Sequence, residues 1–306
     1  MQVRRLTVLG TASQVPTARR NHIGFFLRWD KEGILFDPGE GTQRQLLLAG
    51  IKSSEITKIC LTHFHGDHCL GLPGVVQRLS LDKVEHQVKI FYPASGQKYL
   101  DNLLEASAFR RTVNIEECPI IHSGIIYVGQ GFYLEAHPLD HGIDTWGYRL
   151  KEPDSRTIQP DLLPSELKGP AIGELKNKGS IEFEGRRIAL DEVSKLKYGQ
   201  CFAMVMDTRI CENAFKLAYE ADLLLCESTY LAEEEELAYN YRHLTAGQAA
   251  HIAKESGSKL LVLAHYSQRY SEVDHFAREA AEIHPQVIAA EDGKVVFMPK
   301  IQRDFG

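Results

Sequence analysis

Three histidines and one aspartate fall within six consecutive positions of the chain, in the run HFHGDH at residues 63–68. The run directly follows a short apolar segment that ends at Leu61, which is typical of a strand. Four such side chains cannot all point the same way from one helix or one strand, so a turn leaving the strand must splay them. The fold therefore needs a strand end at this point, followed by a turn into a helix.

The chemistry of the run indicates a metal site. His63 and His65 can share one direction while Asp67 and His68 swing to another, so that two neighbouring ions could each take a pair. Imidazole and carboxylate suit zinc, with manganese or iron as alternatives, and no thiolate is needed. The competing interpretation is a polar loop that happens to be rich in histidine. Four ligand-type residues at this spacing favour the metal.

Outside the run, strand-like and helix-like segments alternate along both halves of the chain, which favours sheets in the middle and helices outside. Predicted strands cover residues 6–9, 23–29, 33–36, 58–62, 88–92, 133–137, 147–150, 202–206, 223–226 and 260–264. Predicted helices cover residues 42–49, 69–81, 96–108, 212–220, 245–256 and 272–283. The acidic run 233–236 fits a solvated helix start.

Composition limits the classes of protein. A net charge of −6 argues against a general nucleic-acid binder, since phosphate contacts need clustered Lys and Arg. The six scattered cysteines contain no CxxC pair and predict free thiols in a reducing compartment. No apolar stretch resembles a signal peptide or a membrane span, so the sequence predicts a cytoplasmic protein with no membrane partner.

One stretch breaks the pattern. Residues 152–197 contain four prolines and many charges with little apolar periodicity, and an insertion of that length inside a compact domain is uncommon. Between 151 and 197, nine Lys and Arg residues balance nine Asp and Glu residues, so the segment is neutral within an acidic chain. It is either a disordered surface loop or an arm that holds a partner, and periodicity leaves both open.

Three more candidate ligands follow predicted strands in the second half. His141 comes after the segment 133–137, Asp207 ends the apolar run FAMVM, and His265 ends LLVLA. Side chains just past buried strands commonly converge from distant parts of a chain. With the first cluster they supply seven groups for a two-metal site, in which Asp207 can bridge both ions.

Taken in this order and spacing, these residues resemble the metallo-β-lactamase superfamily, and within it the ribonuclease Z family of tRNA 3′ processing endonucleases, in its short form. Four further parts of the chain carry the narrower likeness: LGTAS with PTARRN near the start, FDPGEGTQRQ at 36–45, HLTAGQA at 243–249 and AHYSQRY at 264–270. The resemblance implies one domain over residues 1–306 with an αββα four-layer sandwich of two mixed sheets, helices on both outer faces, and a protruding flexible arm at 152–197.

The resemblance also implies a division of roles at the centre. One zinc ion would be held by His63, His65 and His141 and the other by Asp67, His68 and His265, with Asp207 shared. Asp67 would accept the proton of the attacking water. His243, partnered by Glu227, would protonate or steady the leaving oxygen, the alternative for His243 being a neutral core histidine.

For the substrate, the resemblance implies precursor tRNA. The arm would grip the tRNA through a Gly-Pro motif, here Gly169-Pro170, with Lys168 and Lys176 meeting phosphate. Predicted contacts to the RNA near the metals are Arg269, Arg20 and Asn21.

The predicted function is therefore zinc-dependent removal of the 3′ trailer from precursor tRNA, leaving a 3′ hydroxyl on the tRNA, by a homodimeric enzyme. The first alternative is a phosphodiesterase or arylsulfatase of the same fold acting on small esters, which would need no arm. A second alternative is an RNA-binding module that keeps a structural metal. The complete ligand set with Asp67 argues against it, because structural zinc sites are closed and need no base.

Overall fold

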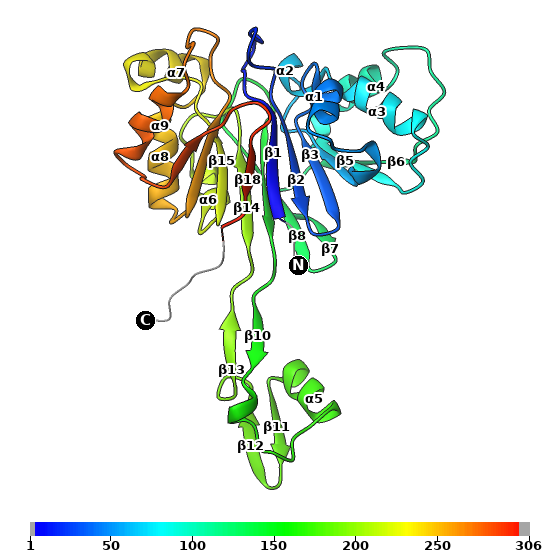
Figure 1. The fold of residues 1–306 in the computed structure, drawn as a ribbon, viewed down its shortest axis with the longest axis vertical. Helices are drawn as coiled ribbons and strands as arrows, with labels where there is room; N and C mark the ends of the chain where they lie inside the picture. Colours follow the sequence, from blue (N-terminus) through cyan, green and yellow to red (C-terminus); the bar gives the residue numbers. More distant parts are fainter. Residues whose placement is uncertain (1–3, 300–306) are drawn as a thin grey trace.

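Two seven-stranded sheets form the body of the molecule in the computed structural model, which describes residues 4–299 (Figure 1). Across the first sheet the strands are β18 (Val295–Phe297), β1 (Arg4–Gly10), β2 (Gly24–Trp29), β3 (Glu32–Phe36), β4 (Lys58–Cys60), β5 (Val88–Pro93) and β6 (Ile115–Ile120). Across the second they are β17 (Val287–Ala289), β16 (Leu260–Ala264), β15 (Leu223–Glu227), β14 (Cys201–Val205), β9 (Trp146–Lys151), β8 (Phe132–Pro138) and β7 (Gly124–Gly129).

Both sheets are mixed. In the first, β18 to β3 pair antiparallel and β3 to β6 pair parallel. In the second, β17 to β14 pair parallel and β14 to β7 pair antiparallel.

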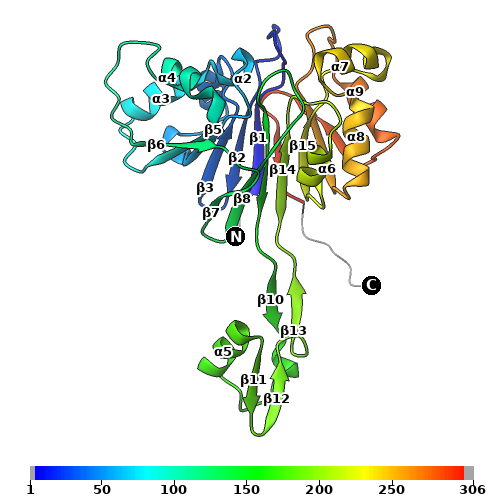
Figure 2. The same cartoon turned by 180° about the vertical axis from the view of Figure 1, so that it is seen from behind.

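Helices cover the outer face of each sheet, as the two opposite views show (Figures 1 and 2). On the side of the first sheet lie α1 (Thr42–Leu48), α2 (Gly66–Cys69), α3 (Leu72–Leu81) and α4 (Gln97–Leu104), with the short turns η1 (Ser53–Glu55) and η2 (Ala94–Gly96). On the other side lie α6 (Glu212–Ala218), η4 (Ala232–Glu234), α7 (Glu235–Tyr241), α8 (Ala246–Glu255) and α9 (Asp274–Ala281). The predicted four-layer arrangement of helices, two sheets and helices is confirmed.

Alternating burial on the strands explains the layers. On β14, Phe202 and Met204 point into the core between the sheets, while Ala203 and Val205 pack against the outer helices. Every residue of β14 is buried, because both of its faces are covered. This is why the central strands read as continuous apolar runs in the sequence.

The main difference from the predicted elements is a break in the helix expected at residues 69–81. In the structure Cys69 ends the short helix α2 and the longer helix α3 begins only at Leu72. Between them, the Gly71 N–H donates to the Pro38 carbonyl at 2.8 Å. A Cβ at residue 71 would lie 2.0 Å from the Gly39 carbonyl oxygen. The close approach of the two loops therefore requires glycine and bends the chain between the helices. The strands β6, β7, β17 and β18 were not predicted. The helix start predicted at the acidic run 233–236 is confirmed by η4 and α7.

The segment 152–197 projects from the body as an arm with regular structure (Figure 1). Its stem pairs β10 (Ser155–Ile158) with β13 (Ser194–Lys197), and its tip contains η3 (Pro160–Leu162), α5 (Pro170–Lys178) and the hairpin β11 (Ser180–Phe183) and β12 (Arg186–Ala189). The tip has a small core of its own, formed by Leu167, Leu175, Ile181, Ile188 and Val193. Three of these residues come from α5, β11 and β12, while Leu167 and Val193 lie in the connecting loops, so no apolar periodicity marks this core in the sequence. No helix in the described part of the chain is long and apolar enough to cross a membrane.

Candidate metal centre

All seven predicted ligands gather at one edge of the body, at the ends of strands from both sheets. β4 is followed by His63 and His65 and then by α2, which carries Asp67 and His68. The remaining ligands follow strands of the second sheet: His141 after β8, Asp207 after β14 and His265 after β16. The arm leaves the opposite end of β14, so the centre and the arm lie at opposite ends of the body (Figure 1).

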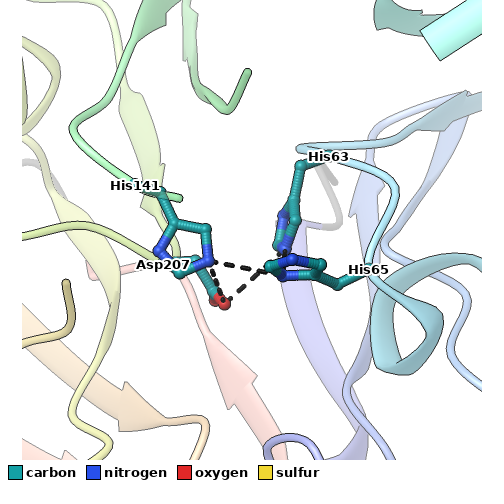
Figure 3. Close-up of side chains that lie close together, drawn as sticks. All are labelled: His63, His65, His141 and Asp207. Carbon is teal, nitrogen blue, oxygen red and sulfur yellow. Dashed lines mark hydrogen bonds and ion pairs between the residues drawn. The ribbon is translucent and has the colours of Figure 1, made fainter. Parts of the chain in front are cut away.

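The first group contains His63, His65, His141 and Asp207. The Nδ1 atom of His65 lies 2.9 Å from Nε2 of His63 and 3.3 Å from Nε2 of His141 (Figure 3). Oδ2 of Asp207 lies 3.7 Å from Nε2 of His63 and 3.6 Å from Nε2 of His141. Two nitrogens bound to one tetrahedral zinc at about 2.0–2.1 Å stand roughly 3.3 Å apart, so this spacing fits a shared ion.

The second group contains Asp67, His68 and His265. Oδ2 of Asp67 lies 3.5 Å from Nε2 of His68 and 3.4 Å from Nε2 of His265. Oδ1 of Asp207 lies 3.3 Å from the same two ring nitrogens. Asp207 thus faces the first group with one oxygen and the second with the other, which is the geometry of a bridging carboxylate.

The backbone is strained where the side chains converge. Asp207 and His265 adopt φ values of 44° and 66°, in the left-handed region that residues with a side chain seldom occupy. Asp37, which contacts the centre from below, has a φ of 42°. Such strain persists only where the surroundings hold it, and it clusters at functional sites.

A further layer of contacts fixes the ring nitrogens of the first sheet's histidines. His68 donates from Nδ1 to Oδ2 of Asp37 at 2.9 Å. Thr62 donates its hydroxyl to the same carboxylate at 2.7 Å, so it accepts from Nδ1 of His63 at 3.0 Å. In their neutral forms both histidines would therefore present Nε2 without a proton to the centre.

The second sheet repeats this arrangement. Thr229 donates to Oε2 of Glu227 at 2.6 Å and therefore accepts from Nδ1 of His265 at 2.9 Å. His141 donates from Nδ1 to the Arg242 carbonyl at 3.0 Å. Sequence reasoning missed Asp37, Thr62, Thr229 and Arg242 as supports, although each lies within a motif or beside a predicted site residue.

The charge states suit a cation. Burial and neighbouring imidazoles lower the pKa of His63, His65 and His141, which keeps these rings neutral and able to bind metal. Burial also disfavours the charged form of His68, but Asp207, Asp67 and Asp37 outweigh it and raise the pKa of His68, so this ring must lose a proton when a cation binds. Burial disfavours the charged form of Asp207, but His265 and His68 outweigh it and hold its pKa well below the usual range. Asp207 Oδ1 and His68 Nε2 are buried with no hydrogen-bond partner. A divalent metal would satisfy both atoms, so the residues fit a metal centre.

His243 and Glu227 form a buried pair beside this centre. Nδ1 of His243 lies 2.9 Å from Oε1 of Glu227, a carboxylate that is fully buried and also accepts the Thr208 backbone N–H at 2.7 Å. Burial disfavours the charged His243 ring, but Glu227 outweighs burial and raises the pKa of His243 to about 9. His243 is also close enough to Asp207 and His265 to be a ligand. Because Glu227 holds Nδ1 of His243, the charged ring can give up a proton from Nε2 to a group in the cavity, which fits the role of a proton donor.

The centre opens into a cavity of about 580 Å³. Besides the candidate ligands, its walls contain His22, Tyr230, Tyr241, His243 and Arg269. The sequence did not mark His22 or the two tyrosines as site residues. Aromatic rings beside a hydrolytic centre offer stacking surfaces for bases.

The predicted RNA contacts lie in three places. Arg269 lines the cavity, where its guanidinium is 5.3 Å from the ring of Tyr230 and 2.8 Å from Oε1 of Glu234. Arg20 lies instead in the wall of a second cavity of about 430 Å³ and is only 7% exposed, and Asn21 is tied to the Glu40 carbonyl at 2.8 Å. The four predicted contacts of the arm, Lys168, Gly169, Pro170 and Lys176, are exposed at its tip.

Comparisons with known proteins agree with this geometry. Residues 25–158 match the model of the metallo-beta-lactamase superfamily. The chain is 50% identical to Ribonuclease Z of Streptomyces coelicolor, over 98% of this chain and 99% of that protein. It is 46% identical to Ribonuclease Z of Chlamydia muridarum, with coverage of 98% and 99%. Among solved structures, human tRNase Z, short form, superposes with a TM-score of 0.72 at 25% identity, covering 97% of this chain and all of that one.

Proposed function

The chain belongs to the ribonuclease Z family of the metallo-β-lactamase superfamily, and we propose that it is an endoribonuclease that removes the 3′ trailer from precursor tRNA, leaving a 3′ hydroxyl. The relatives' name supplies the substrate class. The observation that carries the chemistry is the pair of ligand groups joined by Asp207, because two adjacent cation sites are typical of phosphodiester hydrolysis.

In this proposal each subunit binds two zinc ions, with manganese or iron as alternatives. His63, His65 and His141 would hold one ion and Asp67, His68 and His265 the other, with Asp207 shared. When bound, such a pair of cations makes water more acidic and offsets the negative charge of the phosphate. The neutral rings and the buried, unpartnered Asp207 oxygen support this assignment.

Asp67 would accept a proton from the attacking water. Although burial disfavours its charged form, His68 and His265 hold its pKa below the usual range, so Asp67 is ionised at neutral pH. Its Oδ2 faces both rings, and the residue lines the cavity that a substrate would enter. A carboxylate held at this point can accept a proton without moving.

His243 would give a proton to the leaving oxygen. The ring lines the same cavity, and the buried Glu227 carboxylate keeps it charged and oriented. Two groups on the cavity wall with opposite charge states, Asp67 ionised and His243 protonated, supply an acid and a base at one pH.

The arm would bind the body of the tRNA. Its tip exposes Lys168, Lys176 and the Gly169-Pro170 corner, and these can contact phosphate or backbone. Near the centre, Arg269 is available to a phosphate on the cavity wall. Arg20 would need the loop 16–21 to shift, because its guanidinium is buried against the Ser267 carbonyl at 3.1 Å.

A second copy of the chain is the other proposed partner. Four leucines, Leu47, Leu48, Leu70 and Leu81, are exposed on or next to α1 and α3. Exposed apolar side chains are open to contact with a second copy, and the homodimer is otherwise an expectation from the family resemblance. Light scattering on the purified protein would measure the oligomeric state, and a monomer at micromolar concentration would count against the homodimer.

The cytoplasmic location stays a prediction. The six free cysteines are favourable to it, because free thiols are typical of a reducing compartment.

The decisive experiment uses a precursor tRNA with a 3′ trailer, incubated with the metal-loaded protein with and without chelator. Cleavage directly 3′ to the tRNA, abolished by chelator and restored by zinc, is the expected result. The alternative activity on small esters predicts an intact trailer together with hydrolysis of bis(p-nitrophenyl) phosphate, and that outcome would reject the nuclease.

A further inference from the structure

The arm joins the body through two segments without regular pairing, residues 152–154 and 198–200, called here the arm root. The ladder between β9 and β14 ends at Lys151 and Cys201, and strand pairing resumes only in the stem of the arm. Pro153 has no N–H to give to a ladder. The direction of the arm therefore depends on what else holds the root.

One buried guanidinium bonds both segments of the arm root. Nη1 of Arg4 donates to Oε2 of Glu152 at 2.8 Å and to Oε1 of Gln200 at 3.0 Å. The same Glu152 oxygen accepts the Gln200 backbone N–H at 3.2 Å, and the Glu152 N–H donates to the Gln200 carbonyl at 2.9 Å. Both segments thus share one closed network of hydrogen bonds with Arg4.

The other side of the guanidinium is fixed to the body. Arg4 is on β1 in the first sheet, whereas the arm grows from the second. Nε and Nη2 of Arg4 donate to Oδ2 of Asp30 at 3.1 and 2.7 Å, and the guanidinium lies 4.1 Å above the ring of Trp29. The Arg4 side chain is 4% exposed, so water screens these contacts little. Arg4 therefore connects the arm root to the opposite sheet.

Close packing limits the root to one arrangement. A Cβ at Gly199 would lie 1.8 Å from the Glu152 carbonyl oxygen, and the Gly199 N–H donates to Oδ1 of Asp154 at 2.9 Å. The Gln200 side chain also donates to the Pro299 carbonyl at 2.8 Å. With Arg4 in place, the two segments have paired side chains and little space in which to turn.

We propose that Arg4 is a positioning residue that fixes the direction of the arm and thereby sets the affinity for the substrate that the arm holds. The proposal rests on the proposed function for the identity of that substrate. Arg4 acts through Glu152 and Gln200, at the end of the body opposite the metal centre, and is not part of the chemistry.

The test is the substitution R4M, which removes the guanidinium of Arg4 and keeps an unbranched apolar side chain at this position. In R4M the arm samples several directions, so the fraction of molecules competent to bind falls and KM for precursor tRNA rises about tenfold. The value of kcat and the hydrolysis of bis(p-nitrophenyl) phosphate stay as in the wild type. R4K retains the positive charge but lacks the planar guanidinium that donates to several acceptors at once, so it recovers part of the affinity for precursor tRNA.

The matched control is R28M. Arg28 is on the adjacent strand β2, is part-buried, and pairs with Glu55 of the body instead of the arm root. It should leave KM for precursor tRNA unchanged. E152Q removes the charge of the arm-side partner and leaves the Arg4–Asp30 pair intact, so it should raise KM even if R4M folds poorly.

Hydrogen exchange gives a readout that needs no substrate. In R4M the amides of Glu152, Gly199 and Gln200 should exchange faster than in the wild type and R28M, while those of β14 do not change. Unchanged exchange at the root, or equal losses of tRNA and small-ester activity, would overturn the proposal. Failure of the wild type to cleave precursor tRNA would instead refute the proposed function, and the exchange result would still decide whether Arg4 holds the arm.

Discussion

Asp67 is the residue on which the proposed chemistry most depends, because it is both a candidate ligand and the candidate base. Replacing it with Ala leaves His63, His65, His141 and Asp207 able to hold one ion. We expect D67A to reduce kcat for trailer removal at least about a thousandfold, while tRNA binding in a gel-shift assay persists. Full activity in D67A would remove Asp67 from both roles.

The pair of His243 and Glu227 predicts a pH dependence. Glu227 raises the pKa of His243 to about 9, so the proton needed by the leaving oxygen is present below this pH and is lost as pH rises through it. In E227Q the charge is gone and the pKa of His243 falls, since burial then dominates. The alkaline limb of kcat against pH should therefore move to lower pH in E227Q. An unmoved limb would mean that His243 is not the acid.

Replacing Asp37 tests whether its hydrogen bonds to His68 and Thr62 are needed to orient the candidate metal ligands. Its carboxylate accepts from Nδ1 of His68 and from the backbone N–H and hydroxyl of Thr62. We expect D37A to weaken metal binding about 10–100-fold, because the rings lose their orientation. Competition with a chromogenic chelator measures this directly, and an unchanged affinity would show that the rings are held by packing alone.

Among single residues, the sequence could identify the candidate metal ligands but not the residues that hydrogen-bond to those ligands and orient them. The run HFHGDH and the strand-end positions of His141, Asp207 and His265 identify seven donors, since strand ends converge in such folds. Asp37 is 31 positions from His68, and no periodicity links the two. Hydrogen bonds between loops depend on how the sheets pack, which a single sequence does not encode locally.

Among the elements, the arm is separable from the body. Its tip has its own core of five residues, and its stem is an antiparallel pair. Replacing residues 155–197 with a two-residue Asn-Gly turn should keep the fold, because such a turn suits a hairpin. We expect KM for precursor tRNA to rise far more than KM for bis(p-nitrophenyl) phosphate. Equal changes in both would refute the role of the arm in binding tRNA.

Strands could be predicted from the sequence where they are buried along their whole length, because such strands appear as continuous apolar runs. β14 to β16 are apolar runs that the sequence marks plainly, and their predicted positions agree with the structure. β6 was missed because five of its six residues are only partly buried or exposed and two are glutamates. The break at Gly71 was missed because its cause is a contact with Gly39, a tertiary effect.

For the whole molecule, metal binding should add to stability. The candidate ligands join both sheets, so metal that binds only the folded chain opposes their separation. At a thousand times its dissociation constant, a bound ion contributes about 4 kcal/mol, so chelation should lower Tm by roughly 5–10 °C. Differential scanning calorimetry with and without zinc measures this shift. The same Tm in both conditions would place the metal outside the folding equilibrium.

The spread of donors along the chain also has a consequence for protein synthesis. A nascent chain that has emerged only as far as residue 206 carries five of the seven donors, but lacks the carboxylate that joins the two groups and the last imidazole, at 265. The C-terminal strands and helices must leave the ribosome before the second sheet closes over the first. Both groups of candidate ligands are therefore complete only after residue 265 has left the ribosome, and a chain that stops short of it lacks the last imidazole.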